Sequence, residues 1–272
     1  MESGLQAICA KQTLCKCCGG LAFPFGVVDF HKNCEIVRRR VFDVSGVPIY
    51  YYRCRQCHFI FTTAFDQFTH EDFRQYIYNQ EYLLIDPDYQ ETRPAGNAQI
   101  VCNLFPEARP RRILDYGGGH GVLAPLLRTS GFSHAETYDP FVPRYSAKPL
   151  DRFDCVVCFE VVEHSTDPAR VFADMSDLLT DSGLILFSTL LQPVDIDSQG
   201  LNWWYAAPRN GHVSLYTKAS LAMLAQPLGF NLGSFNESYH VLFRGIPDFA
   251  KHFIRPTDPC ALAEHASAIS VA

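Results

Sequence analysis

The sequence predicts an α/β protein built on a doubly wound parallel sheet, with an antiparallel C-terminal hairpin and a small N-terminal metal-binding module. Three observations predict this fold. A glycine turn joins a buried strand to a helix, apolar strands alternate with amphipathic helices after that turn, and two C-x-x-C pairs precede it. At 272 residues, of which 47% are hydrophobic, the chain is long enough for one α/β core and one small module.

The composition narrows the classes of function. A net charge of −6 argues against a broad phosphate-binding face, so nucleic acid is not expected as a substrate. The first residues contain no basic region followed by a long apolar run, and no later segment reaches the roughly 18 apolar residues of a membrane span. We therefore expect a cytoplasmic protein that acts on a small molecule and binds no membrane. The composition leaves the oligomeric state open.

Paired cysteines mark the first part of the chain. The total of 11 cysteines is odd, and several occur in C-x-x-C pairs, among them Cys15 with Cys18 and Cys54 with Cys57 in the first part of the chain. This pattern favours metal binding in a reducing compartment over a disulfide framework. Each pair presents two thiolates to one ion, so the two pairs complete a tetrahedral Zn²⁺ site. Because all four ligands are sulfur, the site is expected to be closed and structural.

The spacer between the two pairs is longer than in the most compact zinc modules. Strands expected over Leu21–Phe30 and Val47–Tyr52 would fill it as a ribbon. Four further side chains could replace a cysteine ligand: Cys17, His31, Cys34 and His58. The alternative without metal is a set of buried free cysteines, which is common for a single cysteine but not for two paired knuckles.

We divide the chain into the metal-binding module over residues 1–64, a tyrosine-rich helical linker over 65–105, the main domain over 106–256 and a tail over 257–272. The aromatic residues of the linker follow no single period. One interpretation is a half-buried helix that packs on the main domain, and the other is a lid over a ligand site. The tail is rich in Ala and Ser and is expected to be poorly ordered.

The main domain begins with a short buried strand over residues 112–115, which leads through a glycine turn into a helix containing Pro125. Glycines let a ligand approach the main chain closely, because they carry no Cβ and adopt positive φ. The helix N-terminus adds unpaired N–H groups and a positive dipole end, and proline is tolerated in a first helical turn. The turn is therefore the predicted ligand site.

Two ligand classes compete for this turn. Residues 119–124 match the dinucleotide fingerprint G-x-G-x-x-G/A, and Asp139 lies near the position of its ribose-binding acid. Against a dinucleotide, Asp115 closes the strand and starts the pattern D-x-G-x-G-x-G. A carboxylate there would repel a pyrophosphate but would pair with the amino group of a methionine moiety. We favour a methyl donor, with an NAD-dependent oxidoreductase as the alternative.

The remaining elements follow in the order of a doubly wound sheet. The second strand is expected over Ala135–Asp139, and Pro140–Leu150 is too short for a helix, a strand and a second helix, so one edge strand is expected to be lost. The later elements are a strand over Phe153–Cys158, a helix around Val171–Leu179, a strand over Leu184–Thr189, a helix over Lys218–Ala225, and strands over Asn231–Asn236 and Tyr239–Arg244.

The Asp115 glycine pattern, the acidic and His-bearing turn after the third strand, and the element order resemble class I S-adenosylmethionine-dependent methyltransferases, over about Ile113 to Arg244. The resemblance implies a Rossmann-like domain that binds S-adenosylmethionine. Asp115 would pair with its amino group, Asp139 with its ribose hydroxyls and Arg93 with its carboxylate, and tyrosine rings would stack on its sulfonium. The predicted donor-binding residues are Tyr78, Arg93, Asp115, Gly117, Gly119, Gly121, Asp139, Pro140, Phe159 and Glu160.

Glu160, Glu163 and His164 form an E-x-x-E-H pattern whose spacing would put all three on one helix face. The pattern resembles the metal-binding motif of ubiquinone-biosynthesis O-methyltransferases and of small-RNA 2′-O-methyltransferases, in which a divalent ion orients the acceptor hydroxyl. Similar E–H pairs also cap this helix in metal-free relatives. A second metal ion therefore stays open at this point.

Methyl transfer is an in-line displacement, so catalysis is mainly alignment, and a base is needed only when the acceptor must lose a proton. His212 is the first candidate base because its intrinsic pKa suits the task, and Glu163 and His164 are the second. A hydrogen-bonded loop histidine is the alternative for His212. The predicted acceptor pocket lies between the segment around Tyr78 and the loop that ends at His212, and its substrate-binding residues are Tyr82, Trp203, Trp204, Tyr205 and Arg209.

A zinc module ahead of such a domain resembles the sugar C-methyltransferases and other methyltransferases of glycan and natural-product pathways. We expect the chain to differ from the sugar C-methyltransferases in lacking their long C-terminal domain, so their catalytic residues are not carried over. The resemblance implies a sugar, a glycan precursor or a natural-product intermediate as acceptor. A non-catalytic module that binds S-adenosylmethionine is a further alternative.

Overall fold

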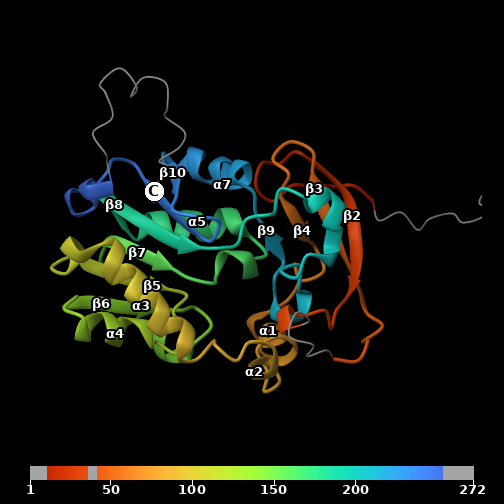
Figure 1. Cartoon of the computed structure of the whole chain (residues 1–272), viewed down its shortest axis with the longest axis horizontal. Coiled ribbons are helices and arrows are strands. Elements are labelled where there is room, and N and C mark those ends of the chain that lie inside the picture. Colours follow the sequence, from red (N-terminus) through yellow and green to blue (C-terminus); the bar gives the residue numbers. More distant parts are fainter. Residues whose placement is uncertain (1–10, 36–41, 254–272) are drawn as a thin grey trace, which may run out of the picture. The chain divides into compact units, whose positions relative to one another are not determined.

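The computed structural model describes residues 11–35 and 42–253, and these residues form two compact units (Figure 1). The ribbon unit comprises the described residues within Met1–Ile85, Glu163–Pro168 and Leu191–Met223, and the glycine-turn unit comprises those within Asp86–Val162, Ala169–Leu190 and Leu224–Ala272. The tail predicted over 257–272 lies outside the described residues. No helix within the described ranges has the length and apolar character needed to cross a membrane.

The glycine-turn unit contains a six-stranded sheet in the order β10-β11-β8-β7-β5-β6. Its strands are β5 (Arg112–Tyr116), β6 (His134–Tyr138), β7 (Phe153–Cys158), β8 (Leu179–Ser188), β10 (Asn231–Ser234) and β11 (Tyr239–Phe243). The pairings β5–β6, β5–β7 and β7–β8 are parallel, whereas β11 runs antiparallel to β8 and to β10. The structure thus confirms the predicted doubly wound sheet and its antiparallel C-terminal hairpin.

β6 forms one edge of this sheet. Between β6 and β7 the described chain contains only a single 3-10 turn, Pro143–Tyr145, and no strand beyond β6. The short connection cannot supply a crossover helix and a further strand. The predicted loss of an edge strand is therefore confirmed within the described residues.

Helices cover both faces of the sheet, as the alternation of apolar runs predicts. On one face, α3 (Thr92–Leu104) and α4 (Leu123–Thr129) contribute Val101 and Leu127 to a core that also contains Ile113 and Leu186. On the other face lies α5 (Pro168–Asp177), and its Phe172 ring packs perpendicular to Phe187 of β8 at 5.4 Å. The central strands are buried on both sides, which explains their continuous apolar sequences.

The ribbon unit is organised on a second sheet, with the order β1-β2-β3-β4-β9 and antiparallel pairings throughout; Figure 1 labels β2, β3, β4 and β9 of this sheet. Its strands are β1 (Thr13–Leu14), β2 (Leu21–Asp29), β3 (Pro48–Cys54), β4 (Ile60–Thr62) and β9 (Ser214–Leu215). The two ribbon strands predicted between the cysteine pairs are β2 and β3. The remaining α-helices in the described part of the chain are α1 (His70–Tyr76), α2 (Tyr82–Ile85), α6 (Ile196–Gln199) and α7 (Lys218–Ala225).

β9 belongs to the second half of the sequence, yet it pairs with β4 of the N-terminal module. The expected division placed this segment within a main domain over 106–256, whereas the compact units place Leu191–Met223 with the ribbon. The physical reason is the edge of β4, whose free backbone groups are satisfied by β9. A pairing over such a long sequence separation leaves no local signal.

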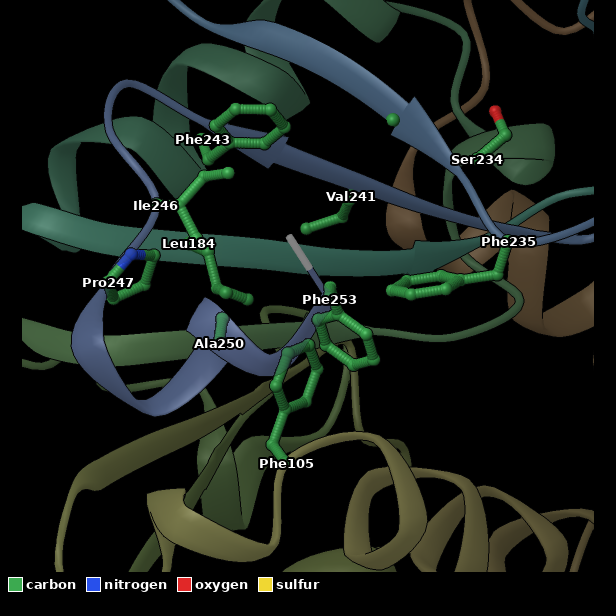
Figure 2. A pocket seen from close by; sticks show the side chains of 11 residues that line it. Phe105, Leu184, Ser234, Phe235, Val241, Phe243, Ile246, Pro247, Ala250 and Phe253 are labelled. Carbon is green, nitrogen blue, oxygen red and sulfur yellow. The ribbon is translucent and has the colours of Figure 1, made fainter. Parts of the chain in front are cut away.

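An apolar pocket lies in the glycine-turn unit, among the C-terminal strands and the last described residues (Figure 2). Its lining includes Phe105, Leu184, Val241 and Phe253, and none of the side chains that line it is ionisable. A reaction that moves a proton or orders a charged ligand needs such groups. The candidate reaction sites are therefore elsewhere.

Candidate functional site

Asp115 is the buried acid of the glycine-turn unit. It is the second-to-last residue of β5 and is 3% exposed. Its carboxylate accepts a hydrogen bond from the Thr137 hydroxyl at 3.3 Å. Burial raises the pKa of Asp115 to about 7; the Thr137 hydrogen bond lowers it and the charge of Asp139 raises it further. A cation bound beside Asp115 would compensate this buried charge.

The turn after β5 needs its glycines. Gly117, Gly119 and Gly121 have φ of 71°, 55° and 72°, the left-handed region that other residues rarely adopt. At Gly117 an added Cβ would stand 2.5 Å from Val161 Cγ2, so a side chain fits neither the dihedral angles nor the space. The main chain of the turn is therefore closely approached by a side chain of the same unit, and the approach of a ligand stays a prediction.

Asp139 ties the turn to the end of β6. Its carboxylate accepts the N–H groups of Gly119 and Phe141, each at 2.8 Å, and Gly117 N donates to the Tyr138 carbonyl at 2.7 Å. Asp139 is thus the turn former that local sequence would suggest. Each carboxylate oxygen has a second lone pair, so the same group can also accept a ligand hydroxyl.

Tyr89 is a residue of this site that sequence reasoning did not select. Its hydroxyl lies 3.2 Å from the place a Cβ would take on Gly119, and its ring meets the His120 ring edge-on at 6.0 Å. Burial raises the pKa of Tyr89, and the charges of Asp139 and Asp86 raise it further, so the hydroxyl stays protonated. The sequence offered only one tyrosine among many, without a spacing that singles it out.

Glu160 departs from the predicted arrangement. Its φ is 56°, its N–H donates to the Ser188 hydroxyl, and its carboxylate accepts from that hydroxyl, both at 2.8 Å. The helical turn after it, Val162–His164, is a short 3-10 helix that excludes Glu160. The expectation that Glu160, Glu163 and His164 share one helix face is therefore wrong, because Ser188 at the end of β8 holds Glu160 in a left-handed conformation.

Of three other predicted donor residues, Arg93 and Phe159 have partners within the glycine-turn unit. Arg93 forms a bidentate pair with Asp86 at 2.7 and 2.9 Å, so a donor carboxylate would have to share this guanidinium. Phe159 is buried and packs edge-on against Tyr239, and Pro140 directly follows Asp139. Their roles toward a donor stay predictions.

The ribbon unit brings together a second group of predicted residues. Three possible metal-ligand atoms lie within 4.8 Å of one another, one each from Glu163, His164 and His212. His212 is nevertheless far from the other two in sequence. The rings of His164 and His212 meet edge-on at 5.0 Å, and Val213 N donates to the Glu163 carbonyl at 2.9 Å. We call these three side chains the histidine cluster.

Tyr205 orients two members of the histidine cluster. Its hydroxyl donates to Glu163 Oε1 at 2.7 Å, and its carbonyl oxygen lies 2.9 Å from His212 Nδ1. A carbonyl can only accept, so Nδ1 carries a proton and the lone pair of neutral His212 is on Nε2. In this tautomer Nε2 is the ring nitrogen whose lone pair could take a proton or bind a metal ion.

The predicted acceptor walls are mostly internal. Tyr82, Trp203 and Tyr205 are at most 5% exposed, whereas Trp204 is 39% exposed. Tyr78, predicted as a donor contact, has its ring 5.2 Å from Tyr82 and 6.2 Å from His164, within the ribbon unit. The structure thus groups Tyr78 with the histidine cluster.

Arg209, predicted to hold a substrate anion, is 2% exposed. Its guanidinium donates to the Ile77 carbonyl and to Asn79 Oδ1, both at 2.8 Å, and lies 3.3 Å from Glu81. These contacts connect the loop before His212 to the chain between α1 and α2. They describe a structural arginine, and a role toward the acceptor stays a prediction.

The four cysteines of the two C-x-x-C pairs converge as predicted. The Sγ atoms of Cys15, Cys18, Cys54 and Cys57 lie within 4.8 Å of one another, with Cys15 to Cys57 at 3.6 Å and Cys18 to Cys54 at 3.5 Å. Tetrahedral Zn–S bonds of about 2.3 Å place sulfur atoms about 3.8 Å apart, so the cluster fits zinc. Cys34, one alternative ligand, instead lies 3.8 Å from His212 Nδ1.

Comparison with known proteins gives partial matches. Ubiquinone biosynthesis O-methyltransferase from Actinobacillus pleuropneumoniae is 26% identical over 107 residues, which is 29% of this chain and 46% of the relative. The enzyme of that name from Salmonella arizonae is 28% identical over 103 residues, which is 29% of this chain and 43% of the relative. The chain therefore spans less than half the length of these curated relatives.

Solved structures of other proteins are also similar to part of this chain. An O-methyltransferase family protein from Burkholderia thailandensis has a TM-score of 0.48 at 13% identity, covering 66% of this chain and 64% of that one. The 1,6-didemethyltoxoflavin-N1-methyltransferase of the same organism has a TM-score of 0.47 at 17% identity, covering 74% and 96%.

A family profile described as "Methyltransferase domain" matches residues 89–234, which is more than half of the chain. The match begins at Tyr89 and includes Asp115, the glycine turn and Asp139. It therefore covers the elements from which the structure builds the buried acid and the glycine turn. On this match, the chain belongs to the methyltransferase domain family.

Proposed function

We propose that the protein transfers a methyl group from S-adenosylmethionine to a hydroxyl of a small-molecule acceptor. The observation that carries the proposal is Asp115, a buried carboxyl directly before the glycine turn in a chain of the methyltransferase domain family. An ammonium group beside Asp115 would compensate the cost of ionising it, whereas a pyrophosphate would add to that cost. This argues for S-adenosylmethionine and against NAD.

The donor would be held by residues of the glycine-turn unit. Asp115 would accept hydrogen bonds from the donor ammonium, and the free lone pairs of Asp139 would accept the ribose hydroxyls. Tyr89, next to Gly119, offers a hydroxyl and a ring face near the turn. Arg93 and Glu160 complete the set of polar groups, each already held by a partner, Asp86 and Ser188.

The histidine cluster would serve the acceptor. In the reaction the acceptor oxygen forms a bond to the methyl carbon, the carbon–sulfur bond breaks, and S-adenosylhomocysteine and one proton are released. Nε2 of His212 is the group we assign to take that proton, since Nδ1 is committed to the Tyr205 carbonyl. Such a base contributes roughly 10²–10⁴-fold to the rate.

A divalent ion on the histidine cluster is the second candidate for activating the acceptor. One carboxylate and two imidazoles, with ligand atoms within 4.8 Å, form a donor set that suits ions such as Zn²⁺ or Mn²⁺. A bound ion would polarise the acceptor oxygen and lower the pKa of its hydroxyl. Glu163, His164 and His212 would be its ligands, and Tyr205 would orient Glu163 and His212.

The four-cysteine cluster would hold one structural Zn²⁺. All four ligands are thiolates, which leaves no position for water or substrate. The acceptor itself is proposed only by class: a sugar, a glycan precursor or a natural-product intermediate. Trp204, with its partly exposed ring, is the aromatic side chain we assign to contact it.

Calorimetric titration with S-adenosylhomocysteine and with NADH tests the proposal. We expect saturable binding of the first and none of the second; the reverse result would make the chain an oxidoreductase. Turnover is then measured as S-adenosylhomocysteine release with a panel of catechols, sugars and sugar nucleotides. Donor binding without turnover on any of them would favour a non-catalytic binding module.

The role of His212 is tested with the acceptor that this panel selects. His212→Ala should lower turnover by roughly 10²–10⁴-fold and leave the affinity for S-adenosylhomocysteine unchanged. His134→Ala, at an exposed position, is the matched control. Equal activity of His212→Ala and the control would return His212 to a structural role.

A further inference from the structure

The segment that carries His212 is built into the antiparallel sheet of the ribbon unit. Ser214 of β9 pairs with Phe61 of β4, and Thr62 N donates to the Val213 carbonyl at 3.0 Å. On its other side Val213 N donates to the Glu163 carbonyl, and the Ser214 hydroxyl donates to the Ser165 carbonyl at 2.7 Å. One hydrogen-bond ladder therefore connects β4 to both segments of the histidine cluster.

Tyr51 contacts the main chain of His212 directly. It lies in the middle of β3, is fully buried, and donates its hydroxyl hydrogen to the His212 carbonyl at 2.7 Å. Burial raises the pKa of Tyr51, so the hydroxyl remains a donor at neutral pH. The neighbouring Tyr50 lies on the opposite face of the sheet, because successive side chains of a strand alternate, and it is 40% exposed.

The loop before His212 is also anchored on the ribbon. The side chain of Leu201 packs where Gly26 has no Cβ; an added Cβ would stand 2.9 Å from Leu201 Cδ1. Lys32 Nζ donates to the carbonyls of Trp203 at 2.8 Å and Ala206 at 2.6 Å. These contacts hold the part of the loop that precedes His212, whereas β9 holds the part that follows it.

The second C-x-x-C knuckle, at Cys54 and Cys57, accepts hydrogen bonds from residues at both ends of the same loop. The Thr217 hydroxyl donates to the Cys57 carbonyl at 2.8 Å, and Gln192 Nε2 donates to the His58 carbonyl at 3.0 Å. Cys54 ends β3 and Cys57 precedes β4, so the four-cysteine cluster also holds the two strands that contact His212 and Val213. Ribbon, loop and histidine cluster thus form one hydrogen-bonded set within the ribbon unit.

We propose that Tyr51 is a positioning residue for the histidine cluster and that the four-cysteine ribbon is the scaffold that holds Glu163, His164 and His212 together. The chemical role of the histidine cluster in this inference rests on the proposed function. The contacts that hold the cluster in place do not depend on that function. Tyr51 fixes the main chain at His212, and Tyr205 fixes the ring. A displacement of about 1 Å at a reacting group can lower a rate by about 10²-fold, so this scaffold matters for catalysis.

Hydrogen–deuterium exchange of the zinc-loaded full chain tests the scaffold without any ligand. Tyr51→Phe removes the hydroxyl and leaves the His212 carbonyl buried without it, which should speed exchange of the Thr62 and Val213 amides about tenfold. Tyr50→Phe is the matched control and should leave them unchanged, and exchange of the Asp139 and Phe141 amides should not respond to either variant. Unchanged Thr62 and Val213 exchange in Tyr51→Phe would overturn the proposal.

Titration with Mn²⁺, followed by electron paramagnetic resonance, gives a second readout, because this hard ion does not compete for thiolates. In Tyr51→Phe and in Ser214→Ala the affinity for Mn²⁺ should fall roughly 10–100-fold, as when an outer partner of a metal ligand is removed. Equal affinity in wild type and both variants would overturn the positioning role. If the wild-type protein binds no Mn²⁺ but Tyr51→Phe still speeds exchange of the Thr62 and Val213 amides, the scaffold is supported. That result would count only against the metal ion in the proposed function.

Discussion

At the scale of single residues, Asp115 is the group whose charge the fold controls most directly. Its pKa is raised to about 7 by burial, so the carboxyl of the free protein is protonated below that pH. A donor ammonium favours the carboxylate, and binding therefore releases a proton under acidic conditions. Affinity for S-adenosylhomocysteine should rise about tenfold per pH unit up to about pH 7 and be constant above it.

Calorimetry between pH 5.5 and 8.5 measures this dependence. Asp115→Asn should bind the ligand more weakly and without the pH dependence, since the amide does not titrate and cannot pair with the ammonium as a carboxylate does. A wild-type affinity that is flat across this range would mean that Asp115 does not meet the charged amino group.

At the scale of an element, the turn after β5 depends on backbone shape more than on side chains. Gly117→Ala forces φ of 71° on a residue with a Cβ and places that Cβ against Val161, so we expect a loss of at least roughly 2 kcal/mol in the free energy of unfolding. Gly96→Ala is the control, because Gly96 lies within α3 with open space around it. That variant should gain roughly 0.5–1 kcal/mol.

Urea unfolding followed by circular dichroism compares the two alanine variants, and the titration with S-adenosylhomocysteine reports the state of the turn. The opposite signs of the two changes separate a local backbone requirement from a general effect of removing glycine. Wild-type stability and affinity in Gly117→Ala would show that the turn accommodates a side chain.

At the scale of the whole molecule, the two compact units divide the roles. The buried acid and glycine turn lie in one unit, and the four-cysteine and histidine clusters lie in the other. Metal analysis of protein purified without added metal should find at least one zinc per chain. Removal of this zinc by a chelator should lower the stability of the ribbon sheet and leave binding of S-adenosylhomocysteine within a few-fold of its original value.

Cys54→Ser should lose this zinc and reduce stability or solubility, because a structural zinc site contributes directly to folding. Cys102→Ser is the matched control, since Cys102 lies in α3, away from the four-cysteine cluster in sequence and in unit. A metal-free preparation that keeps the far-ultraviolet spectrum and melting temperature of the original protein would contradict the zinc assignment.

Local sequence patterns were enough for the elements whose side chains are set by burial or by backbone shape. The run Phe153–Cys158 is a strand because it is buried on both faces, and Lys218–Ala225 is a helix over the range that its composition predicts. The turn after Asp115 follows from glycine, and the four cysteines converge because two C-x-x-C knuckles suit one ion. The strand, the helix, the turn and each single knuckle depend on neighbours within a few residues, whereas the two knuckles that meet are far apart in sequence.

Tertiary structure alone decided which distant segments meet. No local pattern indicates that β9 pairs with β4, that Tyr51 contacts the His212 carbonyl, or that Tyr89 lies next to Gly119. The same holds for Glu160, which helical spacing grouped with Glu163 but which Ser188 holds in a left-handed conformation. The sequence by itself determined the fold class and most of the candidate residues, because these depend on local propensity and burial, whereas the composition of each cluster depends on backbone pairings between segments far apart in the chain.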